Sequence, residues 1–183
     1  MTPSTSSYSS AVEYERTFLA REIPAEVRSS MPVRMVDIYV PDTEGIHPTV
    51  RLRKRGKDYE ITKKSLINDT DSSEMLEENV ALTQEEFESL AAGHHRMVEK
   101  DRYKVLINGR LAEIDVFSGR LEGLVIIDFE FLNNADKAAF TPPPCCLVEV
   151  TQEATFAGGN LAGKSYADVS DALAKLNYQR LAQ

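Results

Sequence analysis

The stretch VEYERTFLA, residues 12–20, predicts a β-strand that places two carboxylates on one face. Residues two apart on a strand share a face, so Glu13 and Glu15 point the same way, while Tyr14 and Phe18 lie on the other face. Like charges side by side repel each other and reduce stability unless water or a positive group compensates them. Such a strand therefore lies either on a solvated surface or opposite positive charge.

Other predicted strands also carry paired charges of one sign. Alternating or β-rich runs lie at about 12–19, 33–40, 49–55, 59–64, 75–82, 98–107, 110–117, 124–131 and 147–151. Their same-face pairs are Arg51 with Arg53, Thr62 with Lys64, Lys100 with Arg102, Glu113 with Asp115, and Asp128 with Glu130. One alternative is a half-exposed sheet with a solvated charged face, but such faces usually mix signs within each strand. The repeated pattern favours the other alternative, a closed sheet whose charged faces meet in a wet cavity.

Turn and helix signals separate these runs. Asn108-Gly109 lies between two strands and predicts a tight hairpin. Thr83 and Glu86 have the spacing of a capping box, which predicts the start of a helix. A short helix is expected at about 134–140, before the prolines at 142–144, and a last helix from about Ser165 through Leu181.

The composition is typical of a soluble globular protein of one domain. With 183 residues the chain suffices for a single domain, expected at 12–183, after a Ser/Thr-rich N-terminal tail, 1–11, expected to be disordered. A net charge of −8 argues against general binding to nucleic acid or to an anionic membrane. No apolar run approaches the roughly 20 residues of a membrane helix, and no secretory signal is recognised. The adjacent Cys145 and Cys146 are expected to pack as thiols in the cytoplasm.

The charged faces together indicate phosphoryl chemistry. Arginine offers bidentate donors to phosphate oxygens and lysine offers a compact charge, so the basic strands suit an anion with several oxygens. The carboxylates would repel that anion unless a metal lay between them. Clustered carboxylate oxygens favour hard cations such as Mg²⁺ or Mn²⁺. The segment AGGNLAGKSY, 157–166, imitates a phosphate-binding loop, but its spacing does not match one.

Seven motifs occur in the order found in a known family. They are EYERTFL at 13–19, VRLRKRG at 50–56, YEITKKS at 59–65, EKDRY at 99–103, AEIDVFSGRLEGLVIIDFEF at 112–131, AAFTPPP at 138–144 and VEVTQEATF at 148–156. From about residue 12 to residue 162, the sequence resembles the CYTH superfamily, the triphosphate tunnel metalloenzymes. No single motif is decisive, and their shared order carries the resemblance.

The resemblance implies an α+β fold, in which an eight-stranded antiparallel β-barrel forms a tunnel flanked by helices. A triphosphate-bearing small molecule would bind inside it with Mg²⁺ or Mn²⁺. By motif position, the metal ligands would be Glu13, Glu15, Glu130 and Asp128, and the phosphate would be held by Arg51, Arg53, Lys64, Lys100 and Arg102. The catalytic residues would be Glu13, Glu15, Lys100 and Arg102, supported by Glu77, Glu113, Asp115 and Tyr39. The alternative for Tyr39 is a packed strand aromatic.

The chain departs from the family pattern at cationic positions. Thr17 stands where the first motif has a lysine, and Ala154 and Thr155 stand where two further cations are expected. Each lost contact to a desolvated phosphate could cost roughly 1.5–3 kcal/mol. Arg55 continues the face of Arg51 and Arg53, so it is a further candidate for phosphate binding, with a solvated turn residue as the alternative.

Three functions fit these features. The first is metal-dependent hydrolysis of a triphosphate, most simply inorganic tripolyphosphate, with thiamine triphosphate or nucleotides as other substrates. The second is a tunnel that binds metal or triphosphate with weakened turnover, as the departures at Thr17, Ala154 and Thr155 suggest. The third is adenylate cyclisation, for which no base pocket is recognised. A homodimer is expected by resemblance.

Overall fold

The computed structural model describes residues 8–43, 46–68 and 70–182. The strands are β1 (Tyr8–Ala20), β2 (Val33–Val40), β3 (Val50–Arg55), β4 (Asp58–Leu66), β5 (Glu74–Leu82), β6 (Met97–Ile107), β7 (Arg110–Phe117), β8 (Val125–Phe131) and β9 (Cys146–Glu149). The α-helices are α1 (Gln84–Ala91), α2 (Asn134–Ala139), α3 (Gly158–Leu161) and α4 (Tyr166–Lys175). Short 3₁₀ helices cover Ala25–Ser29, Gly119–Leu121 and Ala154–Phe156. Within the described ranges, no helix is both long and apolar enough to cross a membrane.

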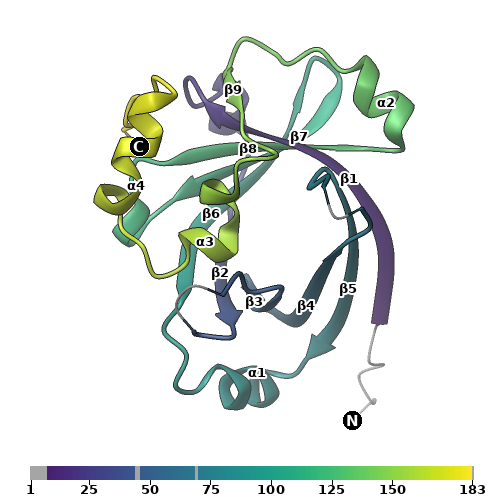
Figure 1. Ribbon diagram of the computed structural model, residues 1–183, viewed down its shortest axis with the longest axis vertical. Helices are drawn as coiled ribbons and strands as arrows, with labels where there is room; N and C mark the ends of the chain where they lie inside the picture. Colours follow the sequence, from purple (N-terminus) through teal and green to yellow (C-terminus); the bar gives the residue numbers. More distant parts are fainter. Residues whose placement is uncertain (1–7, 44–45, 69, 183) are drawn as a thin grey trace.

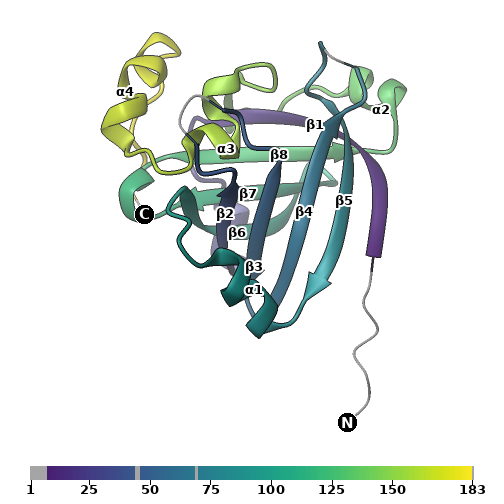
Figure 2. The same ribbon diagram turned by 60° about the horizontal axis from the view of Figure 1, so that its bottom comes forward.

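The strands form a closed antiparallel barrel of eight strands. Their order in the sheet is β5-β4-β3-β2-β6-β7-β8-β1, and β1 also pairs with β5, which closes the ring. The ninth strand, β9, pairs with the last part of β1 beyond the ring. Figures 1 and 2 show the barrel with α3 and α4 together on one side and α1 at the bottom. The predicted barrel fold is therefore confirmed.

The β6–β7 hairpin shows how local sequence sets the register of the charged faces. Asn108 and Gly109 both have positive φ, 52° and 79°, as a tight two-residue turn requires. The turn places Arg102 opposite Asp115 and Lys104 opposite Glu113 across the ladder. The turn therefore puts each base beside an acid. A shift of the strand register by one residue would send these side chains to the other face of the sheet.

Apolar residues pack on the outside of the barrel in two places. Thr83 and Glu86 form the predicted capping box of α1, and Phe87 of that helix packs against Tyr59 of β4 with ring centroids 5.0 Å apart. The larger outer core lies over β1, β7 and β8 and includes Phe18, Ile114 and Phe129, which are all fully buried. Burial of these outward side chains turns the alternating charged residues toward the inside.

A third apolar cluster fills one end of the barrel interior. Leu19, Tyr39, Val98, Phe117 and Ile126 each lie two residues beyond an inward polar or charged residue, so they continue the inner faces of their strands. They form one buried cluster with residues of the segment that follows β9 and of α3 and α4, namely Phe156, Leu161, Ala162, Val169 and Leu173. The charged part of the interior is therefore closed at this end by apolar packing.

Two predicted boundaries are wrong. The structure begins β1 at Tyr8, because Tyr8 through Ala11 pair with Val80 through Glu77 of β5, so this part of the predicted disordered tail is strand. The rest of that tail, 1–7, lies outside the described residues. At the other end, α4 stops at Lys175 instead of continuing to Leu181, because Asn177 takes a positive φ of 58°.

Candidate active site in the barrel interior

The inner faces of the strands carry the charged residues that the sequence singled out. The interior acids are Glu13 and Glu15 on β1, Asp37 on β2, Glu77 on β5, Glu113 and Asp115 on β7, and Asp128 and Glu130 on β8. The interior cations are Arg51 and Arg53 on β3, Lys64 on β4, and Lys100 and Arg102 on β6. All the paired charges found in the sequence therefore face one shared interior, and most of them form ion pairs there.

Asp37 and Arg53 form the most deeply buried ion pair. Arg53 donates from Nε to Oδ1 at 2.6 Å and from Nη2 to Oδ2 at 2.7 Å, a bidentate arrangement. Burial alone would raise the pKa of Asp37, but the charge and hydrogen bonds of Arg53 hold it well below its usual range. Asp37 is not among the residues predicted from the sequence, although its place two residues before Tyr39 on the same predicted strand was a usable signal.

Asp115 joins the two cations of β6. It accepts hydrogen bonds from Nζ of Lys100 at 2.5 Å and from Nε of Arg102 at 2.6 Å. Arg102 also donates to Glu113, and its Nη2 lies 3.7 Å from Oδ2 of Asp128. Burial alone would raise the pKa of Asp115, but Arg102 and Lys100 lower it strongly. Asp115 therefore stays ionised and fixes both cations in the orientation expected of a supporting residue.

Lys64 lies among three carboxylates where β1, β4 and β5 meet. Its Nζ is 2.6 Å from Glu13, 3.1 Å from Glu77 and 3.9 Å from Glu15. Glu77 also accepts a hydrogen bond from Nη2 of Arg51 at 3.2 Å. Burial opposes ionisation of Glu77, but Lys64 and Arg51 lower its pKa to about 2. Three carboxylates thus surround the ammonium group of Lys64.

Carboxylates on β1 and β8 face one another with little compensation. Glu15 lies directly opposite Glu130, and Thr17 opposite Asp128. Burial, together with the negative charges of Glu15 and Asp115, raises the pKa of Asp128 to about 7. Burial and the negative charge of Glu113 likewise raise the pKa of Glu130, and burial raises the pKa of Glu13 despite Lys64. This side of the interior holds more negative charge than its neighbours neutralise.

The donor set here fits a hard divalent cation. Glu13, Glu15, Glu130 and Asp128 offer carboxylate oxygens, which Mg²⁺ and Mn²⁺ prefer. The raised pKa values of Glu13, Glu130 and Asp128 reflect burial and, after it, repulsion from neighbouring carboxylates, which a cation would relieve. Within the described ranges, no three acidic, histidine or cysteine side chains already converge closely enough to hold a metal. These four side chains are the ones that would hold a metal here, and their carboxylates would supply its ligands.

The basic side contains a donor that lacks an acceptor. Nε of Arg51 is buried, and no atom of the described residues accepts a hydrogen bond from it. Buried donors are nearly always paired, so an unpaired one at the wall of a charged interior indicates an acceptor supplied from outside the chain. A phosphate oxygen is an acceptor of the kind that arginine binds best.

Three further candidates lie at the ends of the interior. Tyr39 is buried in the apolar cluster, and its hydroxyl lies so close to Gly158 of α3 that a Cβ there would approach it to 2.1 Å. Arg55 is exposed at the end of β3, where its cross-strand partners are Met35 and Asp58. Thr17 is half-buried beside the carboxylates, so the lysine absent from this position would have faced Asp128.

Ala154 and Thr155 lie in the 3₁₀ helix over the apolar end of the barrel. Ala154 is exposed and Thr155 is half-buried, and the next residue, Phe156, packs into the apolar cluster that closes this end. The two cations expected there are thus replaced by small or uncharged residues beside an apolar closure. The candidate phosphate-binding donors are consequently concentrated on β3, β4 and β6.

Comparisons with known proteins agree with this architecture. No family model matches the chain. A curated relative, the inorganic triphosphatase of Nitrosomonas europaea, is 37% identical over 152 residues, which cover 82% of this chain and 96% of the relative. A crystal structure described as an inorganic triphosphatase has a TM-score of 0.60 at 33% identity, covering 82% of this chain and 93% of that one. Another, described as a hypothetical protein, has a TM-score of 0.61 at 32% identity, covering 84% of this chain and 99% of that one. With these likenesses and the closed barrel, the chain belongs to the CYTH superfamily, the triphosphate tunnel metalloenzymes.

Proposed function

We propose that this protein hydrolyses inorganic tripolyphosphate to diphosphate and phosphate, with Mg²⁺ or Mn²⁺, inside the charged barrel. The observation that carries the proposal is the division of the interior into a basic side with an unpaired arginine donor and an acidic side with raised carboxylate pKa values. A phosphate chain would accept the hydrogen bond of the unpaired arginine donor, and a divalent cation would neutralise the carboxylates of the acidic side. The family relative named as an inorganic triphosphatase makes tripolyphosphate the simplest substrate to test.

The charge inside the barrel supports a role for the metal. Among the described residues, the interior carboxylates outnumber the interior cations, so the side chains of the interior carry a net negative charge. A free polyanion entering it would be repelled by the acidic side. A divalent cation, when bound, neutralises phosphate oxygens and can lower the pKa of a water molecule. Glu13, Glu15 and Glu130 would hold it, with Asp128 as a weaker candidate.

The chain's own residues would position the substrate and stabilise developing charge. Arg51 and Arg53 present guanidinium groups from β3, and β6, on the other side of β2, presents the ammonium group of Lys100 and the guanidinium group of Arg102. Asp37 and Asp115 hold Arg53, Lys100 and Arg102 in fixed orientations, so little rearrangement accompanies the reaction. Arg55 at the rim would contact an incoming anion first. Asp128, with its pKa of about 7, is poised to take up or release a proton near neutral pH.

A second candidate function is triphosphate binding with slow turnover. It is favoured by Thr17, Ala154 and Thr155, which replace expected cations, and by the deep pairing of Arg53 and Arg102 with acids of the chain itself. Cations that are already paired with carboxylates must exchange these partners for phosphate oxygens, so phosphate binding gains less free energy. The same site then binds substrate without efficient stabilisation of the transition state.

One assay separates the candidates. Purified protein is incubated with tripolyphosphate, ATP or thiamine triphosphate, each with Mg²⁺ or Mn²⁺, and phosphate, diphosphate and cyclic AMP are quantified. Phosphate release that Glu13→Ala and Arg51→Ala abolish supports hydrolysis in the barrel. Saturable binding without product supports the second candidate, and cyclic AMP would indicate cyclisation. A cytoplasmic location and a homodimer remain predictions, which fractionation of cells and light scattering would test.

A further inference from the structure

Strand β1 changes partners beside the proposed metal site. Its edge facing away from β8 pairs with β5 from Tyr8 to Tyr14, and with β9 from Phe18 onward. Residues 15–17 of that edge belong to neither ladder. Glu15 and Thr17, which face the interior, therefore lie on a piece of wall that lacks a neighbouring strand on one side.

Single residues from outside the ladders bridge this break. The amide of Glu15 donates to the carbonyl of Ser73 at 3.0 Å, and the amide of Thr17 donates to Oγ1 of Thr151 at 3.0 Å. The carbonyl of Thr17 accepts from the amide of Val150 at 2.8 Å. The backbone of Glu15 is thus held on this edge by Ser73, a residue of the loop between β4 and β5. Ser73 therefore fixes the backbone of Glu15 on this edge, while the ladder with β8 fixes it on the other.

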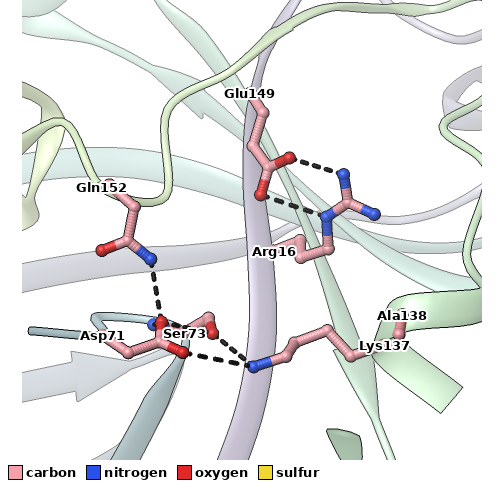
Figure 3. A pocket seen from close by; sticks show the side chains of 7 residues that line it. All are labelled: Arg16, Asp71, Ser73, Lys137, Ala138, Glu149 and Gln152. Atoms are coloured by element: carbon pink, nitrogen blue, oxygen red, sulfur yellow. Dashed lines mark hydrogen bonds and ion pairs between the residues drawn. The ribbon is translucent and has the colours of Figure 1, made fainter. Parts of the chain in front are cut away.

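Ser73 is itself fixed by a polar clamp, which we define as Asp71, Ser73, Lys137 and Gln152 (Figure 3). Asp71 Oδ1 accepts from the amide of Ser73 at 2.9 Å and from its hydroxyl at 2.6 Å. Lys137 of α2 donates to the hydroxyl oxygen of Ser73, and Gln152 donates to Asp71 at 2.9 Å. The clamp therefore ties the loop to α2 and to the turn after β9.

Lys137 is the cation on which the clamp depends. Its Nζ lies 3.2 Å from Glu74 and 3.8 Å from Asp71, and its side chain is only 13% exposed. A cavity of about 310 Å³ lies beside these groups, lined by polar side chains and Ala138. The break in the wall borders this polar cavity on its outer side. Ser73 is held there by hydrogen bonds to Asp71 and Lys137.

We propose that Lys137, acting through Ser73, is a positioning residue that holds Glu15 where it contacts the metal. This inference rests on the proposed function, because it assigns Glu15 to the metal. Lys137 lies on the outer side of the wall and does not touch the interior. Its effect on the reaction passes through one side-chain contact and one backbone hydrogen bond.

The test compares Lys137→Met, Lys137→Arg and Ser73→Ala with the wild type. Lys137→Met keeps most of the length of the side chain but removes its charge, and Ser73→Ala removes the hydroxyl that Lys137 contacts, together with its hydrogen bond to Asp71. Lys175→Met, an exposed position on α4, serves as the matched control. Tripolyphosphate hydrolysis is measured against Mn²⁺ concentration, Mn²⁺ binding by electron paramagnetic resonance, and hydrogen exchange over residues 12–18.

Lys137→Met and Ser73→Ala should raise the Mn²⁺ concentration for half-maximal binding and activity by about 10-fold. KM for tripolyphosphate at saturating Mn²⁺ should change by less than about 2-fold, because the phosphate-binding residues are untouched. Exchange at the Glu15 amide should become faster, and Lys137→Arg should restore most of the binding. Unchanged Mn²⁺ binding in Ser73→Ala, or equal losses in Lys137→Arg and Lys137→Met, would overturn the inference.

Failure of the proposed function would look different. If the wild type hydrolyses tripolyphosphate under no condition, the proposed function is wrong. Mn²⁺ binding and hydrogen exchange at the Glu15 amide would still test the role of the clamp in that protein. If the wild type binds no Mn²⁺, the positioning role is wrong as well.

Discussion

Glu15 on β1 and Glu130 on β8 lie directly opposite each other in an antiparallel ladder, with both side chains on the inner face of the barrel. Like charges at such positions are destabilising, and burial raises the pKa of Glu130 with added repulsion from Glu113. Lys64 approaches Glu15 only to 3.9 Å. The two carboxylates therefore repel each other, and a bound cation would remove that repulsion.

Metal should stabilise the protein through this pair. Mn²⁺ or Mg²⁺ is expected to raise the thermal unfolding temperature above that measured with a chelator, because the metal binds the folded state alone. Without metal, Glu130→Gln should be as stable as the wild type or more stable by up to about 0.5 kcal/mol in the free energy of unfolding. With metal, its unfolding temperature should rise less than that of the wild type. A clear loss of stability in metal-free Glu130→Gln would show that Glu130 is favourably paired, contrary to this interpretation.

Asp128 should make the metal-free protein less stable as pH rises. Its pKa rises from 3.8 to about 7 on folding, so the folded state binds the proton more tightly than the unfolded state. That contribution is complete below about pH 4 and disappears as pH rises through 7. Between pH 6 and pH 8 the loss should be about 1 kcal/mol in the free energy of unfolding.

Chemical denaturation at both pH values, with a chelator present, measures this difference. Asp128→Asn cannot ionise and should flatten the dependence, so the same slope in Asp128→Asn would exclude Asp128 as its source. Because metal competes with the proton for these carboxylates, added Mn²⁺ should stabilise the wild type more at pH 8 than at pH 6.

Removal of Asp37 should be severe. Asp37→Ala leaves the buried Arg53 without its bidentate partner, and breaking such a pair typically costs about 3–5 kcal/mol. Urea denaturation should show this loss, and triphosphate hydrolysis should fall because Arg53 loses its orientation. Asp58→Ala, an exposed position at the start of β4, is the control and should change stability by less than about 0.5 kcal/mol. A loss for Asp37→Ala no larger than the control's would mean that the pair is not structurally important.

Restoring the absent lysine should improve the enzyme. In Thr17→Lys the new side chain would face Asp128 across the ladder and add a cation where the interior is most acidic. We expect kcat/KM for tripolyphosphate to rise by about 10-fold, the size of one charged contact to phosphate. Ser10→Lys adds the same charge to the outer face of β1 and should leave kcat/KM unchanged. No gain in Thr17→Lys would show that the missing cation does not limit turnover.

Most of the fold could be predicted because alternation and turn chemistry are local. The pairs at Arg51 and Arg53, or at Glu113 and Asp115, identify the inner faces by spacing alone, and Asn108-Gly109 sets the hairpin register. The apolar closure could not be predicted in this way. It joins Tyr39 and Phe117 to α3 and α4, and contacts between residues so distant in sequence leave no local pattern.

The charged residues that line the interior could be predicted, but their pairing could not. The sequence identified charged residues on β1 and on β3 through β8, yet it overlooked Asp37, which has no like-charged neighbour on its strand. It also gave no sign of the clamp at Ser73 and Lys137, because the break between β5 and β9 arises only when β1 is shared by two ladders. Which acid neutralises which base depends on how the barrel closes.

The most direct test is a crystal structure with Mn²⁺ and imidotriphosphate, a slowly hydrolysed analogue of tripolyphosphate, with anomalous data collected for manganese. An anomalous peak should lie within coordinating distance of Glu13, Glu15 or Glu130, with phosphate oxygens against Arg53, Lys100 or Nε of Arg51. Manganese and analogue found only on the outer surface, with the interior ion pairs unchanged, would contradict the proposed site.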